Sequence, residues 1–298
     1  ITHFDTANNY VFWINDFKGD ESELTVGKWM KERNNRDDIF LATKCGVRPT
    51  GKNPDGSFAF EGLSKKAVEN ALEGSLKRLG IECVNLYYIH VDWRWEPLEE
   101  TLEALNGLVK AGKVQHIACS NMSTWRVVKS KDISRREGWA EFVGIQNWFS
   151  YLRPRYNADL WVQKFVNDEL LDYSQTEQDL TILPYTSTLG GLYAWDSIYD
   201  WNHPALNNRF FSEDNERRLT VVKEIARDRG ISPFRLMFAW MLSRKASIIP
   251  ILGVSKISQL EDNLGALDLT LTDDEIERLD NAAFNGKTYK DPKEVELS

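Results

Sequence analysis

The chain begins with Ile1-Thr-His-Phe-Asp5-Thr-Ala-Asn-Asn-Tyr10, a stretch that predicts a short strand followed by a polar loop. Alternating apolar positions up to Asp5 are typical of a strand. The loop then brings Tyr10 close to that carboxylate. In parallel α/β folds the loops after the carboxyl ends of the strands converge on one mouth, so both residues are candidates for chemistry. Taken alone, such an Asp is more often a cap, and such a Tyr more often a packing residue.

Lys44 and His90 occupy the same kind of position further along the chain. Lys44 follows the apolar run 39–43, and His90 follows the run 84–89. The other expected strands are 114–119, 142–145, 180–184 and 247–252, and a Gly/Pro/Asn-rich loop is expected at 49–62. Helices are expected at 22–33, 65–79, 98–111, 124–131, 158–173, 217–229, 233–244, 259–267 and 273–283. Regular alternation of strands and helices predicts a parallel sheet.

Two parallel architectures compete, the closed eight-stranded barrel and the open doubly wound sheet. The chain has no Gly-x-Gly-x-x-Gly turn after an early strand, which a doubly wound nucleotide-binding fold would show. Polar residues instead follow nearly every expected strand, as at a barrel mouth. We therefore expect an α/β fold, a (β/α)₈ TIM barrel that forms a single domain over 1–298. Seven strands are expected, so the first strand and helix unit should lie upstream of Ile1.

Composition excludes several classes of function. The formal net charge is -8 and no long uncharged apolar run occurs, which argues against a nucleic-acid surface and against a membrane span. Cys45, Cys83 and Cys119 are odd in number and show no Cys-x-x-Cys spacing, as in a reduced, cytoplasmic protein. His-x-Asp pairs occur, but no His-x-His cluster accompanies them, so no metal is expected.

Asp5, Tyr10, Lys44 and His90 together predict a proton-relay site. A tyrosine has an ordinary pKa of about 10, which is high for a proton donor near neutrality. A neighbouring ammonium lowers that pKa, and a carboxylate keeps the ammonium charged and oriented. His90 can then hydrogen-bond the substrate oxygen. Such a site suits the conversion of a carbonyl to an alcohol.

At this point the chain resembles the aldo-keto reductase family, from Ile1 to Ala283. The matching segments are Phe4-Asp5-Thr6-Ala7 with Tyr10, Ala42-Thr43-Lys44, Ser75-Leu76-Lys77-Arg78-Leu79-Gly80, Tyr88-Ile89-His90-Val91-Asp92, Gly112-Lys113-Val114 with Ser120-Asn121, and Gln146-Asn147. Six segments in the right order are a specific signal. The resemblance implies a reductase in which Tyr10 is the general acid, Lys44 and Asp5 tune it, and His90 orients the carbonyl.

The resemblance also implies a nicotinamide cofactor that binds without a Rossmann domain. Ser120, Asn121 and Gln146 match positions that bind the carboxamide, and Tyr185 matches the aromatic on which the nicotinamide stacks. The pyrophosphate strap corresponds to 187–192, with Ser187, Leu189 and Gly191 as contacts. The adenosine end corresponds to Gly253, Ser255, Lys256, Gln259, Asp262 and Asn263. A cation at Lys256 can pair with a 2′-phosphate, which favours NADP(H) over NAD(H).

Two positions depart from the family pattern. Val11 stands where the family usually has Gly, so the loop after Tyr10 is expected to take another path. Ser187-Thr188 stands where Pro-Leu is common, which leaves the strap contacts open. Trp13, Trp93 and Trp148 are expected on loops at the mouth, either as packing residues or as a flat pocket for a sugar or an aromatic aldehyde.

Three functional classes remain open from the sequence. The first is an NADP(H)-dependent carbonyl reductase for a small aldehyde, ketone or sugar. The second is a cofactor-binding regulator, since potassium-channel β subunits also resemble this family. The third is a Schiff-base aldolase that uses Lys44. An intact set of Asp5, Tyr10, Lys44 and His90 favours the first.

Overall fold

The computed structural model describes residues 2–14, 18–203 and 206–283, and the expected strand residue Ile1 lies outside them. The chain divides into two compact units. Unit 1 comprises 1–148, 160–185 and 245–251, and unit 2 comprises 149–159, 186–244 and 252–298. Within the described residues, no helix has the length and apolar character that crossing a membrane requires.

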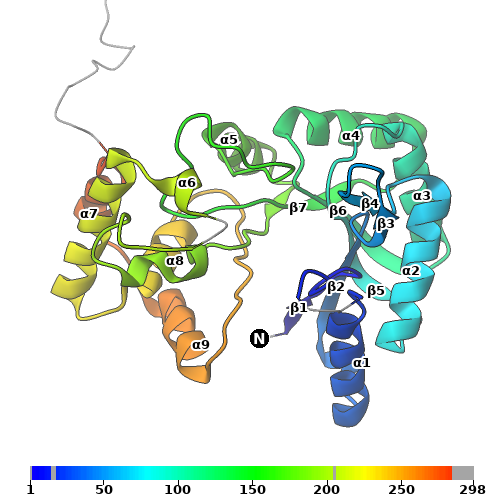
Figure 1. The fold of residues 1–298 in the computed structure, drawn as a ribbon, viewed down its shortest axis with the longest axis horizontal. Helices are drawn as coiled ribbons and strands as arrows, with labels where there is room; N and C mark the ends of the chain where they lie inside the picture. The colour runs from blue at the N-terminus through cyan, green and yellow to red at the C-terminus, as the bar shows by residue number, and fades with distance from the viewer. Residues whose placement is uncertain (1, 15–17, 204–205, 284–298) are drawn as a thin grey trace, which may run out of the picture. The chain divides into compact units, whose positions relative to one another are not determined.

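Unit 1 is built on a six-stranded parallel sheet of order β1-β2-β5-β6-β7-β8 (Figure 1). The strands are β1 (His3–Asp5), β2 (Phe40–Cys45), β5 (Val84–Ile89), β6 (Val114–Ser120), β7 (Phe142–Gln146) and β8 (Thr181–Ile182). Strands that follow one another in this sheet along the chain also lie next to one another in space. The predicted parallel order of strands is therefore confirmed for these six.

Alternation along the strands separates the two faces of this sheet. Asp5 pairs in register with Ala42, Lys44 with Tyr88, and Ser120 with Gln146. Because side chains alternate with a period of two, Lys44 and Ala42 share a face, as do Tyr88 and the following His90. A small core of Ala42, Leu86, Tyr88 and Ala118 packs on that face below the polar residues. The polar strand ends therefore stand on an apolar base.

The opposite face of the sheet is covered by helices, which Figure 1 shows along its outer side. They are α1 (Glu21–Arg33), α2 (Lys65–Leu79), α3 (Leu98–Lys110), α4 (Thr124–Glu137) and α5 (Asp168–Glu177). Thr43 of β2 donates a hydrogen bond to Glu23 of α1, 2.5 Å, and Glu23 also binds Arg78 of α2 at 2.6 Å. A Cβ on Gly27 would lie 2.7 Å from two carbonyl oxygens of α2, so glycine permits the close packing of α1 on α2.

Three segments of unit 1 differ from the sequence prediction. The loop 49–62 contains a hairpin, β3 (Pro49–Lys52) with β4 (Phe58–Phe60), closed by a turn in which Gly56 N donates to Asn53 O at 2.9 Å. The sequence Asn-Pro-Asp-Gly at 53–56 is typical of such a turn. The helix predicted at 158–173 begins only at Asp168, so its first part was wrong. Strand 247–252 is represented by one parallel bridge, Ile182 to Ile248.

The late start of α5 follows from the backbone conformation and pairing of the residues before Asp168. Trp161 has φ +52°, outside the right-handed helical region. Further on, the backbone of 164–166 pairs with Trp148: Trp148 N donates to Lys164 O at 2.9 Å, and Val166 N donates to Trp148 O at 2.8 Å. Asn167 then caps the helix by accepting from Leu170 N. Tertiary pairing therefore prevails over helical periodicity in this segment.

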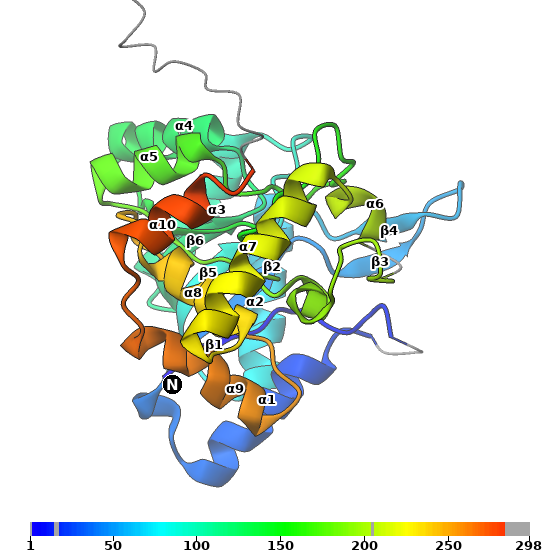
Figure 2. The same cartoon turned by 90° about the vertical axis from the view of Figure 1, so that its left-hand side faces the viewer.

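Unit 2 is mostly helical. It contains η2 (Leu189–Ala194), α6 (Asn207–Phe210), α7 (Glu213–Arg229), α8 (Pro233–Leu242), α9 (Ile257–Leu264), η3 (Gly265–Asp268) and α10 (Asp273–Asp280). α7 packs against α8 and α10 (Figure 2). A hydrogen bond of 2.7 Å from Trp240 Nε1 to Asp280 ties α8 to α10. Within 149–159, the Tyr151 hydroxyl donates to Leu279 O at 2.8 Å.

Candidate active site

Asp5, Tyr10 and Lys44 meet at the carboxyl ends of β1 and β2. Lys44 Nζ donates to the Asp5 carboxylate, to Thr6 O at 2.9 Å and to the Tyr10 hydroxyl at 2.7 Å. The Lys44 side chain is fully buried and that of Asp5 nearly so. An ammonium has three hydrogens, and here each finds an acceptor. The ion pair is therefore fully hydrogen-bonded on its cationic side and fixes the position of the phenol oxygen.

The electrostatics of this cluster differ from the sequence expectation. The pKa of Tyr10 is raised well above 10, first by burial and then by the negative charge of Asp5. Burial also lowers the pKa of Lys44, while Asp5 opposes that shift. Desolvation and Asp5 outweigh the effect expected from the Lys44 ammonium, so the net shift of the Tyr10 pKa is opposite to the predicted one. Tyr10 is therefore a phenol that keeps its proton.

His90 lies beside Tyr10, after the end of β5. The rings of Tyr10 and His90 are 5.8 Å apart and nearly perpendicular. Nδ1 of His90 is 3.1 Å from Oδ1 of Asn9, and Nε2 has no hydrogen bond within the described part of the chain. Burial, followed by the positive charge of Lys44, lowers the pKa of His90 well below 6.5. The imidazole is therefore neutral near pH 7.

The loop after β1, which carries Asn9 and Tyr10, has an unusual backbone conformation. Val11 has φ +69°, a region that glycine adopts freely and a β-branched residue does not. Val11 therefore adopts the backbone conformation that a glycine at this position would adopt more easily. On the other side of the loop, Gly19 has φ +94°, and a Cβ there would lie 2.8 Å from Asn9 Cα. The loop around Tyr10 is therefore packed tightly and strained.

Four residues expected at the nicotinamide lie together in unit 1. Ser120 Oγ donates to Gln146 O at 2.7 Å, and Asn121 Nδ2 donates to Ser120 Oγ at 3.1 Å and to His90 O at 3.0 Å. The Tyr185 hydroxyl donates to Asn121 Oδ1 at 2.8 Å. Gln146 Nε2 donates to Asp5 Oδ2 at 2.9 Å. These four residues are thus connected by hydrogen bonds to both Asp5 and His90.

The three tryptophans of the predicted pocket have different environments. Trp13 is 60% exposed, and its ring is 6.3 Å from that of Tyr10. Trp93 is buried, donates to Gly46 O at 2.5 Å, and stacks between Phe60 and Trp95 at 5.6 and 4.2 Å. Trp148 is fully buried and packs beside Tyr185, at 6.5 Å. Of the three, Trp13 is the one with both exposure and proximity to Tyr10.

The predicted strap lies in unit 2 and has a distinctive backbone. Leu189, Gly190 and Gly191 have φ of +50°, +61° and +92° in succession. Ser187 is buried, and its hydroxyl has no hydrogen-bond partner among the described residues. A right-handed residue followed by a left-handed one, as at Thr188 and Leu189, and an unsatisfied hydroxyl are features of sites that bind anionic oxygens. The residues present therefore fit a phosphate group.

The predicted adenosine residues also lie in unit 2, in α9 and in the segment that precedes it. Gly253, Ser255, Lys256 and Gln259 are exposed, and Asn263 is buried. Gln259 Oε1 accepts from Ser255 N and Lys256 N at 3.0 and 3.2 Å. Asp262 accepts from Ser232 Oγ and pairs with Arg235 at 3.2 Å. The sequence prediction omitted Arg235, which brings a second cation to this corner.

Sequence reasoning also omitted Asn9 and the Gln146–Asp5 hydrogen bond. Asn9 immediately precedes Tyr10, but only the tertiary structure brings it to His90. The polar residues at 8 and 9 were a weak signal, since loops are commonly rich in asparagine.

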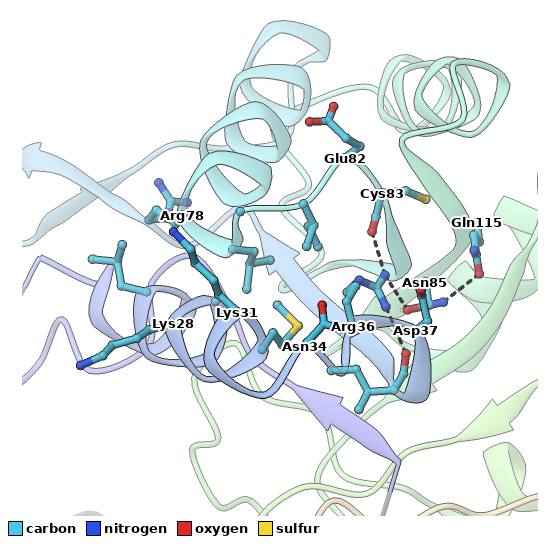
Figure 3. Close-up of a pocket in the computed structure, with 17 residues that line it drawn as sticks. Lys28, Lys31, Asn34, Arg36, Asp37, Arg78, Glu82, Cys83, Asn85 and Gln115 are labelled. Atoms are coloured by element: carbon cyan, nitrogen blue, oxygen red, sulfur yellow. Dashed lines mark hydrogen bonds between the residues drawn. The ribbon is translucent and has the colours of Figure 1, made fainter.

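A cavity of about 990 Å³ lies away from these residues (Figure 3). It is lined by the C-terminal ends of α1 and α2 and by residues that precede β2 and β5 or begin β6, at the amino ends of the strands. Arg36 is among the residues that line it. The guanidinium of Arg36 donates to Ile39 O, Cys83 O and Asn85 Oδ1 at 3.1, 2.8 and 2.9 Å. Because these bonds join strand ends, we interpret Arg36 as structural.

Comparison with known proteins gives a consistent result. The profile of the Aldo/keto reductase family matches residues 1–283. Aldo-keto reductase yakc from Schizosaccharomyces pombe, whose name specifies NADP(+), is 30% identical over 97% of this chain and 81% of its own length. Norsolorinic acid reductase stcV from Emericella nidulans is 27% identical over 93% and 69%.

Solved structures agree with these sequence relatives. A crystal structure of a thermostable aldo-keto reductase with the inhibitor epalrestat has a TM-score of 0.69 and 26% identity, over 94% of this chain and 82% of that one. A putative 2,5-diketo-D-gluconic acid reductase B has a TM-score of 0.68 at 19% identity, over 97% and 81%, and this second likeness concerns the fold alone.

Proposed function

The chain belongs to the aldo/keto reductase family, and on that premise we propose that it reduces a carbonyl compound to an alcohol with NADP(H). Membership makes it an oxidoreductase of the (β/α)₈ class, in agreement with the predicted fold class. Substrate and cofactor details are proposed from the site. We also propose that the chain forms one barrel domain, as the sequence predicted.

The hydrogen-bonded cluster of Asp5, Lys44 and Tyr10 carries the proposal. Lys44 Nζ binds the phenol oxygen at 2.7 Å, so that oxygen already has one donor. The phenol donates only a long hydrogen bond to Asp5, with 3.4 Å between the two oxygens. The phenol proton is therefore available to a substrate oxygen. A phenol that keeps its proton and holds no strong acceptor is suited to be a general acid.

Proton transfer by Tyr10 is supported by its neighbours. When Tyr10 gives its proton to the carbonyl oxygen, the phenolate that remains accepts from the Lys44 ammonium. Asp5 keeps that ammonium charged and in place, and Gln146 binds the other carboxylate oxygen. His90 is proposed to hydrogen-bond the substrate. Solvent then returns a proton to Tyr10.

NADP(H) is the proposed cofactor, and a bound nicotinamide would supply the hydride for the carbonyl carbon. Ser120, Asn121, Gln146 and Tyr185 are proposed to hold the nicotinamide end. Ser187, with its unsatisfied buried hydroxyl, Leu189 and Gly191 are proposed for the pyrophosphate. Gly253, Ser255, Lys256, Gln259, Asp262 and Asn263 are proposed for the adenosine end. The exposed ammonium of Lys256 supports a preference for the 2′-phosphate of NADP(H).

A small carbonyl compound is the proposed substrate, with Trp13, Trp93 and Trp148 around it. Trp13 is exposed next to Tyr10, whereas Trp93 and Trp148 would act mainly by supporting other aromatic rings. Flat apolar surfaces of this kind suit aromatic carbonyl compounds and the apolar faces of sugars.

The Schiff-base alternative is disfavoured by the same cluster. A lysine nucleophile needs an unprotonated nitrogen with an open path to the substrate. Lys44 Nζ is fully buried and has three acceptors within hydrogen-bonding distance. Its role as a fixed ammonium fits this geometry better than a role as a nucleophile.

Titration of tryptophan fluorescence with NADPH and NADH, followed by a carbonyl screen, tests the proposal. We expect NADPH-selective quenching and oxidation of NADPH in step with loss of an aldehyde or ketone. Binding without turnover of any carbonyl would favour the regulatory alternative. A borohydride-trapped adduct on Lys44, formed without nicotinamide, would favour the aldolase.

A further inference from the structure

Glu61 connects the loop that carries Tyr10 to the strand end that carries Lys44. It follows β4, and its Oε1 accepts a hydrogen bond from Asn8 Nδ2 at 2.8 Å and another from Gly46 N at 2.5 Å. Asn8 lies two residues before Tyr10. Gly46 lies two residues after Lys44. One carboxylate oxygen therefore joins the two segments that carry the proposed acid and its ammonium partner.

Asn8 has little freedom apart from this contact. It is fully buried, its N donates to Lys44 O at 3.2 Å, and its O accepts from Arg48 Nη1 at 2.8 Å. Arg48 is itself fixed by an ion pair of 2.6 Å with Asp20. Without Glu61, the buried amide nitrogen of Asn8 would lose its acceptor. Because a buried donor without an acceptor is unfavourable, the chain around Asn8 would then rearrange.

Gly46 provides a fixed point on the other side of the contact. Its O accepts from Trp93 Nε1 at 2.5 Å, and its N is the group that Glu61 binds. Gly46 has φ +104°, a conformation that favours glycine, and a Cβ there would lie 2.9 Å from Leu63 Cδ2. Both backbone polar groups of Gly46 are therefore bound, and Glu61 ties Asn8 to a well-fixed part of the chain.

The loop after Asn8 does not keep its conformation by local preference alone. Val11, the residue after Tyr10, has φ +69°, which is unfavourable for a valine. A strained conformation persists only where the surrounding contacts hold it. Tyr10 lies between the anchored Asn8 and the strained Val11. Loss of the anchor would therefore let the phenol move away from Lys44.

We propose that Glu61 is a positioning residue that keeps the Tyr10 hydroxyl beside Lys44 Nζ. It acts through its two neighbours, by tying Asn8 to Gly46. A displacement of about 1 Å at a catalytic group costs about 10²-fold in rate, so a small relaxation of the loop is sufficient. The inference rests on the proposed function, in which Tyr10 is the general acid.

Single-turnover oxidation of NADPH by 4-nitrobenzaldehyde, an activated aldehyde, tests the proposal. We expect the first-order rate constant to fall about tenfold to hundredfold in Glu61→Leu, with unchanged NADPH affinity. Glu61→Gln should keep most of the rate, because its Oε1 still accepts from both N–H groups. The rate constant does not depend on the fraction of folded molecules, whereas the amplitude does. A lower amplitude with an unchanged rate constant would show a purely structural role and overturn the proposal.

Two further variants identify the contact that carries the effect. Asn8→Leu should slow the reaction as much as Glu61→Leu, and the double variant should be no slower than either. Losses that multiply in the double variant would contradict the proposal. If Glu61→Leu does not fold, Glu61→Asp gives the same comparison, since its carboxylate is one methylene shorter and no longer reaches both donors.

Asp179→Leu is the matched control for loss of a buried carboxylate. Asp179 precedes β8, at the amino end of the sheet, and pairs with Lys131 and Arg135 at 2.7 and 2.8 Å. We expect this variant to lose stability and to keep the wild-type rate constant. An equal decrease of the rate constant in Asp179→Leu and Glu61→Leu would show that the effect of Glu61 is not specific to the loop of Tyr10.

Hydrogen exchange, measured by mass spectrometry without substrate, separates the inference from the function on which it rests. In Glu61→Leu we expect faster exchange at 6–12 and at Gly46, and unchanged protection of β5 and β6. Unchanged exchange in the loop, or faster exchange throughout the sheet, would overturn the proposal. If the wild type reduced neither 4-nitrobenzaldehyde nor any other carbonyl, the reductase function would be refuted. The exchange data would still decide whether Glu61 holds the loop.

Discussion

Nζ of Lys44 lies 2.7 Å from the hydroxyl oxygen of Tyr10, although 33 residues separate them in the sequence. The contact crosses from the carboxyl end of β2 to the loop after β1 and completes a hydrogen-bonded set with Asp5. It couples the stability of the buried ion pair to the position of the proposed acid.

Tyr10→Phe removes the proposed general acid without changing the size of the ring. We expect kcat to fall by a factor of about 10² to 10⁴, which is the range for general acid catalysis, with nearly unchanged NADPH affinity. Tyr87→Phe is the control, because its hydroxyl binds Val68 O on the helix-covered face of the sheet. Steady-state kinetics and fluorescence titration give the comparison. Equal turnover in Tyr10→Phe and the wild type would rule out Tyr10 as the acid.

Lys44→Met leaves the Asp5 carboxylate buried without its counter-ion. We expect the free energy of unfolding to fall by about 3 to 5 kcal/mol, because an uncompensated buried charge is costly. Asp5→Asn combined with Lys44→Met removes both charges and should recover part of this loss. Urea denaturation of the two single variants and the double variant measures the coupling. Additive losses would show that the two charges do not interact.

His90 should make the protein less stable in mild acid. Its pKa is lowered in the folded state, so below about pH 6.5 the unfolded chain binds a proton that the folded chain does not. Stability therefore falls as the pH decreases, by up to about 1.4 kcal/mol per pH unit for one group. His90→Gln should lose less stability than the wild type between about pH 7 and about pH 5. Parallel curves in denaturant experiments would contradict this assignment.

Val11→Gly should stabilise the loop that carries Tyr10. Val11 has φ +69°, where a non-glycine residue costs about 1 to 3 kcal/mol, and part of the gain is offset by the flexibility of glycine in the unfolded chain. We expect a net increase of about 1 kcal/mol in the free energy of unfolding. Val11→Ala should gain less, since it keeps a Cβ. A loss of stability in Val11→Gly would mean that the valine side chain contributes more than the strain costs.

Lys256→Ala should weaken NADPH binding more than NADH binding. A cation that pairs with a phosphate contributes about 1.5 to 3 kcal/mol, so NADPH affinity should fall roughly tenfold or more. Lys256→Arg should retain most of the preference, and Lys129→Ala, on the exposed side of α4, serves as the surface control. Equal losses for both nucleotides would show that Lys256 does not meet the 2′-phosphate.

Local pattern was sufficient for most of the sheet and for the proposed catalytic residues. Lys44 and His90 could be placed near strand ends because they follow the largely apolar runs 39–43 and 84–89, and Asp5 because it ends a stretch of alternating apolar positions. The same reasoning failed at 158–173, where pairing of 164–166 with Trp148 delays the helix. It also missed β3 and β4, whose strands are short and mostly exposed.

The order of strands and helices, and the polar residues near the strand ends, follow from the amino-acid pattern, because side-chain periodicity is a property of neighbours along the chain. How these polar residues behave depends on the packing of the folded chain. Burial and the charge of Asp5 set the pKa of Tyr10 above its ordinary value, against the expectation from its pairing with Lys44. The contact of Asn9 with His90, 81 residues apart, is likewise decided by packing. Desolvation and hydrogen bonding depend on atoms brought together by the fold, and no local pattern contains them.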